Sequence, residues 1–304
     1  AKWIRSHRDL PLRLNQWVNV VRWEFKHPTP FLRTREFLFN EGHTVFATKK
    51  EAEAESKQIL DIYQDVQENY LALPGIRGKK SDKEKFAGAE YSLTFEHILP
   101  DKKAIQGPDF HHDGQNFSKM FKIQFLDQNE KMQFAYQNTF AITTRQIGIM
   151  VATHGDDKGL VLPPKIAPTQ VIIIPIYDNK SKKQVLAKAK EMQEFLSDFR
   201  VEIDNREGYT PGWKFHDAEL KGIPLRVEIG PRDLANKTVV LARRDTGEKK
   251  EIKLNKLGKE VPAKLDAIQK NLFDKAKKFL DESIHEANNM DALKIILNTE
   301  KGFV

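Results

Sequence analysis

The chain has 304 residues, of which 39% are hydrophobic and 31% charged, and this composition predicts a globular protein of about two domains. Its 50 Lys and Arg exceed its 43 Asp and Glu, and the resulting charge of +7 suits either an RNA partner or an ordinary Lys-rich surface. The lack of cysteine excludes disulfides and thiolate zinc sites, and with no signal peptide or membrane-spanning apolar run we expect a cytoplasmic location and no membrane partner.

The first half of the chain predicts strands with one long helix between them. Two runs rich in β-forming residues, 17–25 and 31–39, flank a proline-rich segment and predict an antiparallel pair. Apolar residues at helical spacing predict a helix over 49–71. Three further strands and the start of a second helix follow, at 91–98, 121–126, 134–142 and 146–151.

A domain boundary is expected at Leu160-Val161-Leu162-Pro163-Pro164, because two prolines end an element and stiffen the chain. Beyond it, predicted strands and helices alternate, which indicates an α/β domain with a mainly parallel sheet. The expected domains are 1–164, 165–262 and a helical segment, 263–304. The predicted elements are strands at 171–177, 201–204, 225–229, 239–242 and 251–254, and helices at 181–199, 217–221 and 263–297.

The stretch from Asp109 to Asp113 contains four potential metal ligands in five residues. His111 and His112 are adjacent, so in a strand they point to opposite faces and can hardly bind one ion. Asp113 precedes a glycine, and this dipeptide predicts a turn that its carboxylate serves. We therefore expect no metal site here, and one histidine facing a pocket.

Arginines cluster around the first predicted strand pair. Strand alternation places Arg22 and Glu24 on one face of the first strand, and Arg33 and Arg35 on one face of the second. Guanidinium groups suit bidentate binding of phosphate or carboxylate. The alternative is an exposed sheet face on which Arg and Glu neutralise one another.

Thr143-Thr144-Arg145 ends another predicted strand at a helix start. Arg145 could bind a phosphate or stack on a base, or it could be a solvated residue beside a helix cap. The chain lacks GxxxxGK[ST] and GxGxxG, so a bound nucleotide would be held by arginines on a sheet rather than by a glycine-rich loop.

Long blocks of the sequence resemble the prolyl-tRNA synthetase family of the archaeal/eukaryotic-like type, and the resemblance covers nearly the whole chain. The blocks that carry it are LNQW (14–17), RWEFKHP (22–28), PFLRTREF (30–37), EGHT (41–44), EKFAG (84–88), GQNFSKMF (114–121), TTR (143–145), THGDDKGLVLPP (153–164), TPGWKF (210–215) and ELKGIPLR (219–226).

The resemblance implies an α+β, antiparallel-sheet class II synthetase catalytic domain followed by an α/β anticodon-binding domain. It also implies proline–tRNA ligase activity: L-proline is activated with ATP and Mg²⁺ to prolyl-adenylate and transferred to tRNA(Pro) by a homodimer. Arg22 and Arg145 would be the catalytic residues, with Arg22 on the α-phosphate and the prolyl carboxylate. The implied ATP-binding residues are Arg22, Glu24, Arg33, Thr34, Phe37, Gln106, Thr143 and Arg145, with the adenine between Phe37 and Arg145 and with Gln106 and Thr143 near the ribose or the magnesium.

The implied proline-binding residues are Phe39, Glu41, His43, Phe86, Asp109 and His111. Two segments depart from the family pattern. Pro108-Asp109-Phe110-His111 stands where the family usually has Gly-Thr-Ser-His, and Thr139-Phe140-Ala141-Ile142 stands for Ser-Trp-Gly-Leu. We expect both changes in the proline pocket and expect them to compensate one another, with Asp109 as an added carboxylate for the substrate amine. The alternative is a non-catalytic, tRNA-binding relative.

The resemblance also implies that the chain is the central part of a longer enzyme. It begins just after the place where family members have a Thr-x-Glu loop, and it lacks the segment with the dimer-forming first motif. It stops before the C-terminal zinc-type domain of the family. We therefore expect weak catalysis from this part alone.

Overall fold

The computed structural model describes residues 2–23 and 26–304, and the chain separates into two compact units. Unit 1 comprises Ala1–Asn69, Pro74–Ile149 and Leu280–Val304, and unit 2 comprises Tyr70–Leu73 and Met150–Phe279. Each unit is a set of residues that pack mainly against one another. The domain boundaries expected at 164/165 and 262/263 stay a prediction. Among the described residues, no helix has both the length and the apolarity that crossing a bilayer requires.

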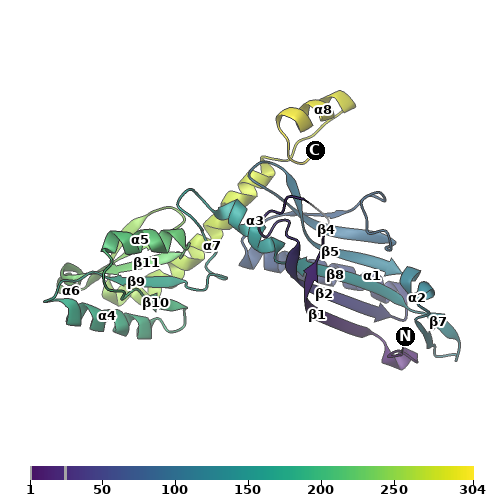
Figure 1. Ribbon diagram of the computed structural model, residues 1–304, viewed down its shortest axis with the longest axis horizontal. Coiled ribbons are helices and arrows are strands. Elements are labelled where there is room, and N and C mark those ends of the chain that lie inside the picture. The colour runs from purple at the N-terminus through teal and green to yellow at the C-terminus, as the bar shows by residue number, and fades with distance from the viewer. Residues whose placement is uncertain (1, 24–25) are drawn as a thin grey trace. The chain divides into compact units, whose positions relative to one another are not determined.

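Unit 1 is built on a six-stranded sheet in which every neighbouring pair is antiparallel (Figure 1). The strand order is β1-β2-β8-β5-β4-β3, so the strand that enters last, β8, lies in the middle. This agrees with the antiparallel sheet that the resemblance implies. The strands are β1 (Leu12–Val21), β2 (Glu36–Phe46), β3 (Ile76–Lys79), β4 (Tyr91–Ile98), β5 (Ala104–Gly114) and β8 (Tyr136–Thr143).

One face of this sheet is covered by helix α1 (Lys49–Asp65). The helix begins with a capping box on Thr48 and continues as the π-helical turn η2 (Val66–Tyr70). Glu55 of α1 is buried against the sheet, where its carboxylate accepts hydrogen bonds from Thr44 and from Asn138, the latter at 3.0 Å. Ligands must therefore reach the sheet from the opposite face.

Short elements complete unit 1. They are η1 (His7–Asp9), α2 (Asn116–Met120), β6 (Gln124–Leu126), β7 (Met132–Phe134) and α8 (Met290–Thr299). Helix α3 (Arg145–His154) leads from unit 1 into unit 2. The last residues of the chain return to unit 1, since the Gly302 amide donates to the Lys102 carbonyl at 3.1 Å and Phe303 forms a β-bridge with Ile284. Of the strand predicted over 121–126, only the three residues of β6 are in a strand.

The predicted strand pair is shifted along the chain. Strand β1 ends at Val21 and β2 begins at Glu36, so Arg33 lies in the connection and not on a strand. Pro28 and Pro30 cannot donate to a sheet, and Phe31 has a left-handed φ of 57°. The expectation that Arg33 and Arg35 share a strand face is therefore wrong, and Arg22 follows the end of β1. Glu24 lies outside the described residues.

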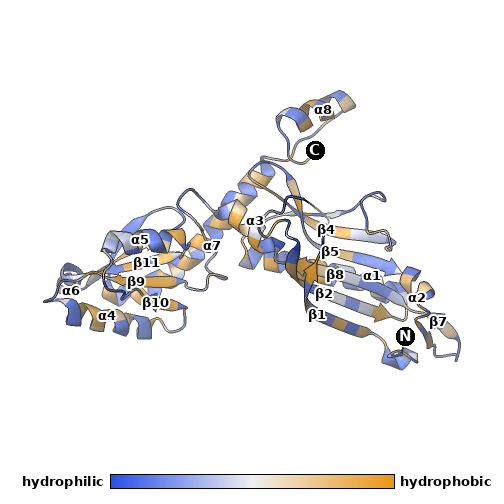
Figure 2. Cartoon of the chain, in the orientation of Figure 1, coloured by the Kyte–Doolittle hydropathy of each residue, from blue (hydrophilic) through white to orange (hydrophobic). Residues whose placement is uncertain are grey.

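Unit 2 contains a five-stranded sheet in the order β10-β9-β11-β12-β13. The first two pairings are parallel and the last two antiparallel, so the sheet is mixed and not mainly parallel as predicted. Figure 2 shows β9 as strongly hydrophobic, whereas in β11 apolar residues alternate with Arg226 and Glu228, and the residues of both strands are buried. The strands are β9 (Val171–Pro175), β10 (Val201–Ile203), β11 (Leu225–Ile229), β12 (Thr238–Arg243) and β13 (Lys249–Lys253).

Helices flank this sheet, and two differ from the sequence prediction. Helix α5 begins at Pro211 rather than near 217, after an N-cap at Thr210. The single helix predicted over 263–297 is two, because α7 ends at Asp281 and α8 begins only after the Asn289 cap. The helical elements of unit 2 are α4 (Lys182–Phe195), α5 (Pro211–Leu220), α6 (Pro231–Asn236), η3 (Leu254–Lys256) and most of α7 (Leu257–Asp281).

Candidate functional site

The exposed face of the unit 1 sheet aligns polar side chains in rows across three strands. Glu41 of β2 pairs with Ala141 of β8, which pairs with Asp109 of β5. In the next row His43 pairs with Thr139, which pairs with His111. Because side chains alternate along a strand, these residues share the face opposite α1. The two outer members of each row are two strands apart, or about 10 Å between backbones.

Each outer strand presents a carboxylate beside a histidine. Glu41 Oε2 lies 3.2 Å from His43 Nε2 and accepts a hydrogen bond from Gln16 Nε2 at 2.7 Å. Asp109 Oδ2 lies 3.3 Å from His111 Nε2 and accepts from Gln106 Nε2 at 2.6 Å. The face therefore carries negative charge on both sides of the Ala141 methyl group. Such an arrangement can attract a small cationic group.

An aromatic wall stands beside His111. The ring of Phe86 lies 5.1 Å from the His111 ring, and the Phe86 amide donates to Ser92 Oγ at 3.0 Å. Ser92 Oγ in turn is 2.7 Å from His111 Nδ1, which fixes the imidazole orientation. Phe39, on β2 of the same face, packs edge-on against Phe37 at 6.0 Å. The expected proline-binding residues thus lie on this face or, for Phe86, at its border.

Guanidinium groups gather where β1, β2 and β8 meet the connection and α3. Arg145, the first residue of α3, is half-buried and donates from Nε to the Leu32 carbonyl at 2.9 Å. Burial lowers its pKa, Asp109 opposes this, and the charges of Arg33 and Arg22 lower it further. The interpretation of Arg145 as a solvated residue beside a cap is therefore wrong. The three arginines are close enough to feel one another's charge, which favours an anionic ligand.

The remaining residues expected at a nucleotide lie near these arginines. The Arg22 guanidinium is 5.4 Å from the Phe37 ring centre. Thr143 Oγ1 accepts from the Arg145 amide at 3.2 Å, and the Gln106 carbonyl accepts from Arg145 Nη1 at 3.4 Å. Thr34 is half-buried in the same connection. Within the described residues, no three His, Cys, Asp or Glu side chains converge as metal ligands.

Only part of each departing segment faces the pocket. Asp109 and Ala141 do, but Phe110 and Phe140 lie on the α1 side of the sheet, where their rings stack at 6.1 Å with an interplanar angle of 4°. His112 is on that side too and contacts Asn138 Oδ1 at 2.8 Å. The expectation that both whole segments line the pocket is wrong, and the expectation that the two changes compensate one another stays a prediction.

The sequence analysis did not identify one buried residue beneath this face, Asp113. Asp113 lies within β5, is 2% exposed, and accepts a hydrogen bond from Thr139 Oγ1 at 3.1 Å. The expectation that its carboxylate serves a turn is wrong, because β5 continues to Gly114. Burial raises the Asp113 pKa to about 6, against the opposing effects of Thr139, His111 and His43. Its alternation with His111 was the signal that could have identified it.

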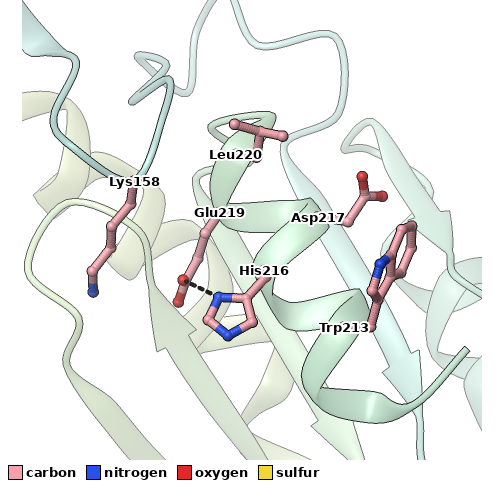
Figure 3. A pocket seen from close by; sticks show the side chains of 6 residues that line it. All are labelled: Lys158, Trp213, His216, Asp217, Glu219 and Leu220. Carbon is pink, nitrogen blue, oxygen red and sulfur yellow. Dashed lines mark ion pairs between the residues drawn. The ribbon is translucent and has the colours of Figure 1, made fainter.

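Unit 2 carries a separate cavity of about 390 Å³ along α5 (Figure 3). His216 and Glu219 lie between Lys158 and Trp213, and His216 Nδ1 is 3.6 Å from Glu219 Oε2. The exposed Trp213 stacks on Tyr209 at 4.1 Å. The remaining lining residues are Asp217 and Leu220.

A second aromatic residue of α5 lies beneath two cations. The Phe215 ring is 4.3 Å from the Arg226 guanidinium and 5.0 Å from Lys249 Nζ. Phe215 is half-buried and packs against an apolar cluster, so Trp213 is the exposed ring of α5 on which a nucleic-acid base could stack.

Residues 1–154 match the tRNA synthetase class II core domain (G, H, P, S and T), and residues 170–264 match the anticodon binding domain. The chain is 48% identical to the cytoplasmic proline–tRNA ligase of Arabidopsis thaliana over 99% of its own length and 58% of that protein. It is 46% identical to a proline–tRNA ligase of Natranaerobius thermophilus over 100% of its length and 63% of the relative. The bifunctional glutamate/proline–tRNA ligase of Mus musculus is 49% identical, over 99% of this chain and 21% of that protein.

Proposed function

The chain belongs to the class II tRNA synthetase family, and from this premise we propose that it is the central part of a proline–tRNA ligase that activates L-proline with ATP and transfers it to tRNA(Pro). The relatives named above as proline–tRNA ligases support the substrate, although the chain spans only 58% and 63% of the length of two of them. The observation that carries the proposal is the sheet face on which carboxylates lie beside guanidinium groups.

Activation needs two anions to meet, since the prolyl carboxylate attacks the α-phosphorus of ATP. In the proposal Arg22 and Arg145 neutralise charge that builds on the phosphate oxygens, and these two are the catalytic residues. Preorganised cations can supply this stabilisation without a covalent protein intermediate. The half-buried, backbone-anchored Arg145 supports this role because its position costs no reorganisation. The further ATP-binding residues are Glu24, Arg33, Thr34, Phe37, Gln106 and Thr143.

Magnesium is part of the proposal as the ion that would enter with ATP. Gln106 Oε1 accepts from Lys80 Nζ at 2.7 Å and Thr143 Oγ1 accepts from the Arg145 amide at 3.2 Å, and a hard cation prefers oxygen ligands. Bound with ATP, Mg²⁺ would neutralise phosphate charge, while these two side chains would lie near it.

The cationic imino group of proline would be held between Glu41 and Asp109. Phe39 and Phe86 would contact the apolar ring, and His43 and His111 would orient the two carboxylates. Asp109 is 14% exposed and hydrogen-bonded, so its charge is held in place before a substrate arrives. A small apolar ring with one charge requires this combination of an aromatic slot and a carboxylate.

Unit 2 would bind tRNA(Pro), which the match to the anticodon binding domain and the exposed Trp213 ring support. The proposal includes a homodimer. It is supported by an apolar patch on the α1 side of β1 and β2, where Trp17, Val21 and Leu38 are 77%, 71% and 57% exposed. A cytoplasmic location is supported by the similarity to the cytoplasmic proline–tRNA ligase of Arabidopsis thaliana.

The test is proline-dependent exchange of pyrophosphate into ATP, measured on the full-length protein that contains this chain. We expect exchange that Arg22→Ala lowers by about a hundredfold or more. No exchange, or wild-type exchange by Arg22→Ala, contradicts the proposal. A non-catalytic tRNA-binding relative would bind tRNA in a salt-sensitive way but would bind no prolyl-adenylate analogue in calorimetry.

A further inference from the structure

The face of the unit 1 sheet that presents Glu41 and Asp109, which we call the substrate face, has a third carboxylate beneath it. This is Asp113, and the proposed mechanism does not use it. Glu41 and Asp109 are each paired with a histidine and an amide donor. Asp113 is more deeply buried than either, at 2% exposure. Its Oδ2 accepts from Thr139, and its Oδ1 has no hydrogen-bond partner in the described structure. A buried acceptor without a partner costs stability and calls for an explanation.

Thr139 connects Asp113 to the substrate face. It occupies the middle strand between His43 and His111, in the row beside Glu41, Ala141 and Asp109. A hydroxyl group has one proton and two lone pairs. Because the Thr139 proton is donated to ionised Asp113, its oxygen is left as an acceptor for a donor on the substrate face.

We propose that Asp113 is a positioning residue for the amino-acid pocket, which makes Thr139 an acceptor for the cationic imino group of the substrate and adds negative charge behind His43 and His111. This inference rests on the proposed function, because it requires the pocket to take an amino acid. Asp113 itself does not touch the substrate. A protonated Asp113 could donate to Thr139, and the hydroxyl would then point its own proton toward the imino group and repel it.

The surroundings of Asp113 define the pH range of this effect. The facing groups are His43 and Glu41 on β2 and His111 and Asp109 on β5, while β8 contributes Thr139 and no acidic or basic side chain at that position. Across the strand end, Glu90 lies beside Gly114 and Lys49 pairs with Glu90 at 2.7 Å. Burial raises the Asp113 pKa to about 6, so its charge is complete at pH 8 and lost by about pH 5.

The melting temperature of Asp113→Asn distinguishes the proposed role from a purely structural one. Because the folded pKa of Asp113 lies above its ordinary value of 3.8, ionised Asp113 destabilises the fold. This cost is absent below the ordinary pKa and complete above about pH 6. Asp113→Asn should therefore raise the melting temperature at pH 8, and the difference should shrink below pH 6 and close near pH 4. If Asp113 mainly held Thr139 in place, the same substitution would lower the melting temperature.

The test is calorimetric binding of a non-hydrolysable prolyl-adenylate analogue to the full-length protein that contains this chain. A matched analogue has a cyclopentane ring and no imino nitrogen. At pH 8 we expect Asp113→Asn to weaken binding of the prolyl analogue by about tenfold or more and to leave the cyclopentane analogue unchanged. At pH 5 wild type and variant should bind alike. Thr139→Val should reproduce the loss, and Thr139→Ser should retain the affinity.

Each other outcome overturns the inference. Equal binding by wild type and Asp113→Asn at pH 8 rejects it and leaves the proposed function standing. Equal losses for the two analogues reject it too, because the effect would not depend on the imino group. If the wild type binds neither analogue, both the inference and the amino-acid pocket fail. Should Asp113→Asn not fold, the Thr139→Val and Thr139→Ser pair decides by the same comparison.

Discussion

In unit 2 the buried carboxylate of Asp204 accepts a hydrogen bond from Arg206 at 2.7 Å and lies 3.7 Å from the buried Lys214 ammonium. In unit 1 the equally buried Asp113 accepts one hydrogen bond, from a hydroxyl, among the residues that the structure describes. Hydrogen bonding to Arg206 lowers the Asp204 pKa, whereas burial raises that of Asp113 to about 6. A carboxylate matched by cations stabilises its fold, and one that is left unmatched is a candidate for work on a ligand.

The arginines of the two units should differ in their effect on catalysis. Replacing Arg145 by Met should lower proline-dependent pyrophosphate exchange by about a hundred- to a thousandfold, because it removes a preorganised charge at the phosphates. Binding of tRNA, which we propose depends on unit 2, should be unchanged. Arg232→Met, an exposed arginine on α6, is the control in both assays. Equal exchange by the Arg145 and Arg232 variants would remove the distinction between the units.

In unit 2 the large effect should be on stability. Asp204→Asn should lower the free energy of unfolding by about 3 kcal/mol, since it leaves Lys214 buried without its counter-charge. Urea unfolding measures the change. Adding Lys214→Met should recover part of the loss, and a further loss on adding it would show that the pair does not act as a unit.

The helices and strands of the two units were only partly predictable from the sequence. The helix α1 and the strands β4, β9 and β11 follow from hydrophobic periodicity, and α1 and β9 end within a few residues of the prediction. The start of β2 was missed because apolar and β-forming residues continue through a loop that Pro28 and Pro30 keep out of the sheet. The gap between α7 and α8 was missed because apolar spacing continues across it, although Asn289 is a cap signal.

The candidate site was predictable as a set of residues but not as a geometry. The blocks that resemble the synthetase family contain the residues of the rows, yet only the register brings Glu41, Ala141 and Asp109 together across three strands. Asp113 was assigned to a turn because Asp-Gly is a turn dipeptide. A single residue of register decides which face a side chain joins, and local sequence does not contain the pairing partner.

Aromatic exposure gives a smaller test of unit 2. Trp213→Ala should weaken tRNA binding by about tenfold, because an exposed ring that is already held by Tyr209 can stack on a base without further ordering. Filter binding at two salt concentrations measures it. Phe195→Ala removes an exposed ring of the same unit from α4 and should have no effect. Equal effects of the two substitutions would argue against a stacking role.

The smallest expected effect concerns the pair of Asp156 with Arg244, whose atoms approach to 2.6 Å. Hydrogen bonding to Arg244 lowers the Asp156 pKa to about 2, so the pair stabilises the fold above the ordinary pKa and loses this contribution as the pH falls through about 2. Since Asp156 is 47% exposed, Asp156→Asn should cost only about 1 kcal/mol at pH 7. The cost should shrink below pH 4 in urea titrations, and a cost that grows in acid would reverse the assignment.

The return of residues 280–304 to unit 1 has a consequence for the order in which the protein is made. The ribosome synthesises the sheet of unit 1 first, then Met150–Phe279 of unit 2, and only afterwards the segment in which the Gly302 amide donates to the Lys102 carbonyl. The first unit therefore waits about 130 residues of synthesis for this contact, or about 7 to 26 seconds at roughly 5 to 20 residues per second. Unit 2 is continuous apart from Tyr70–Leu73, so it can fold during that interval.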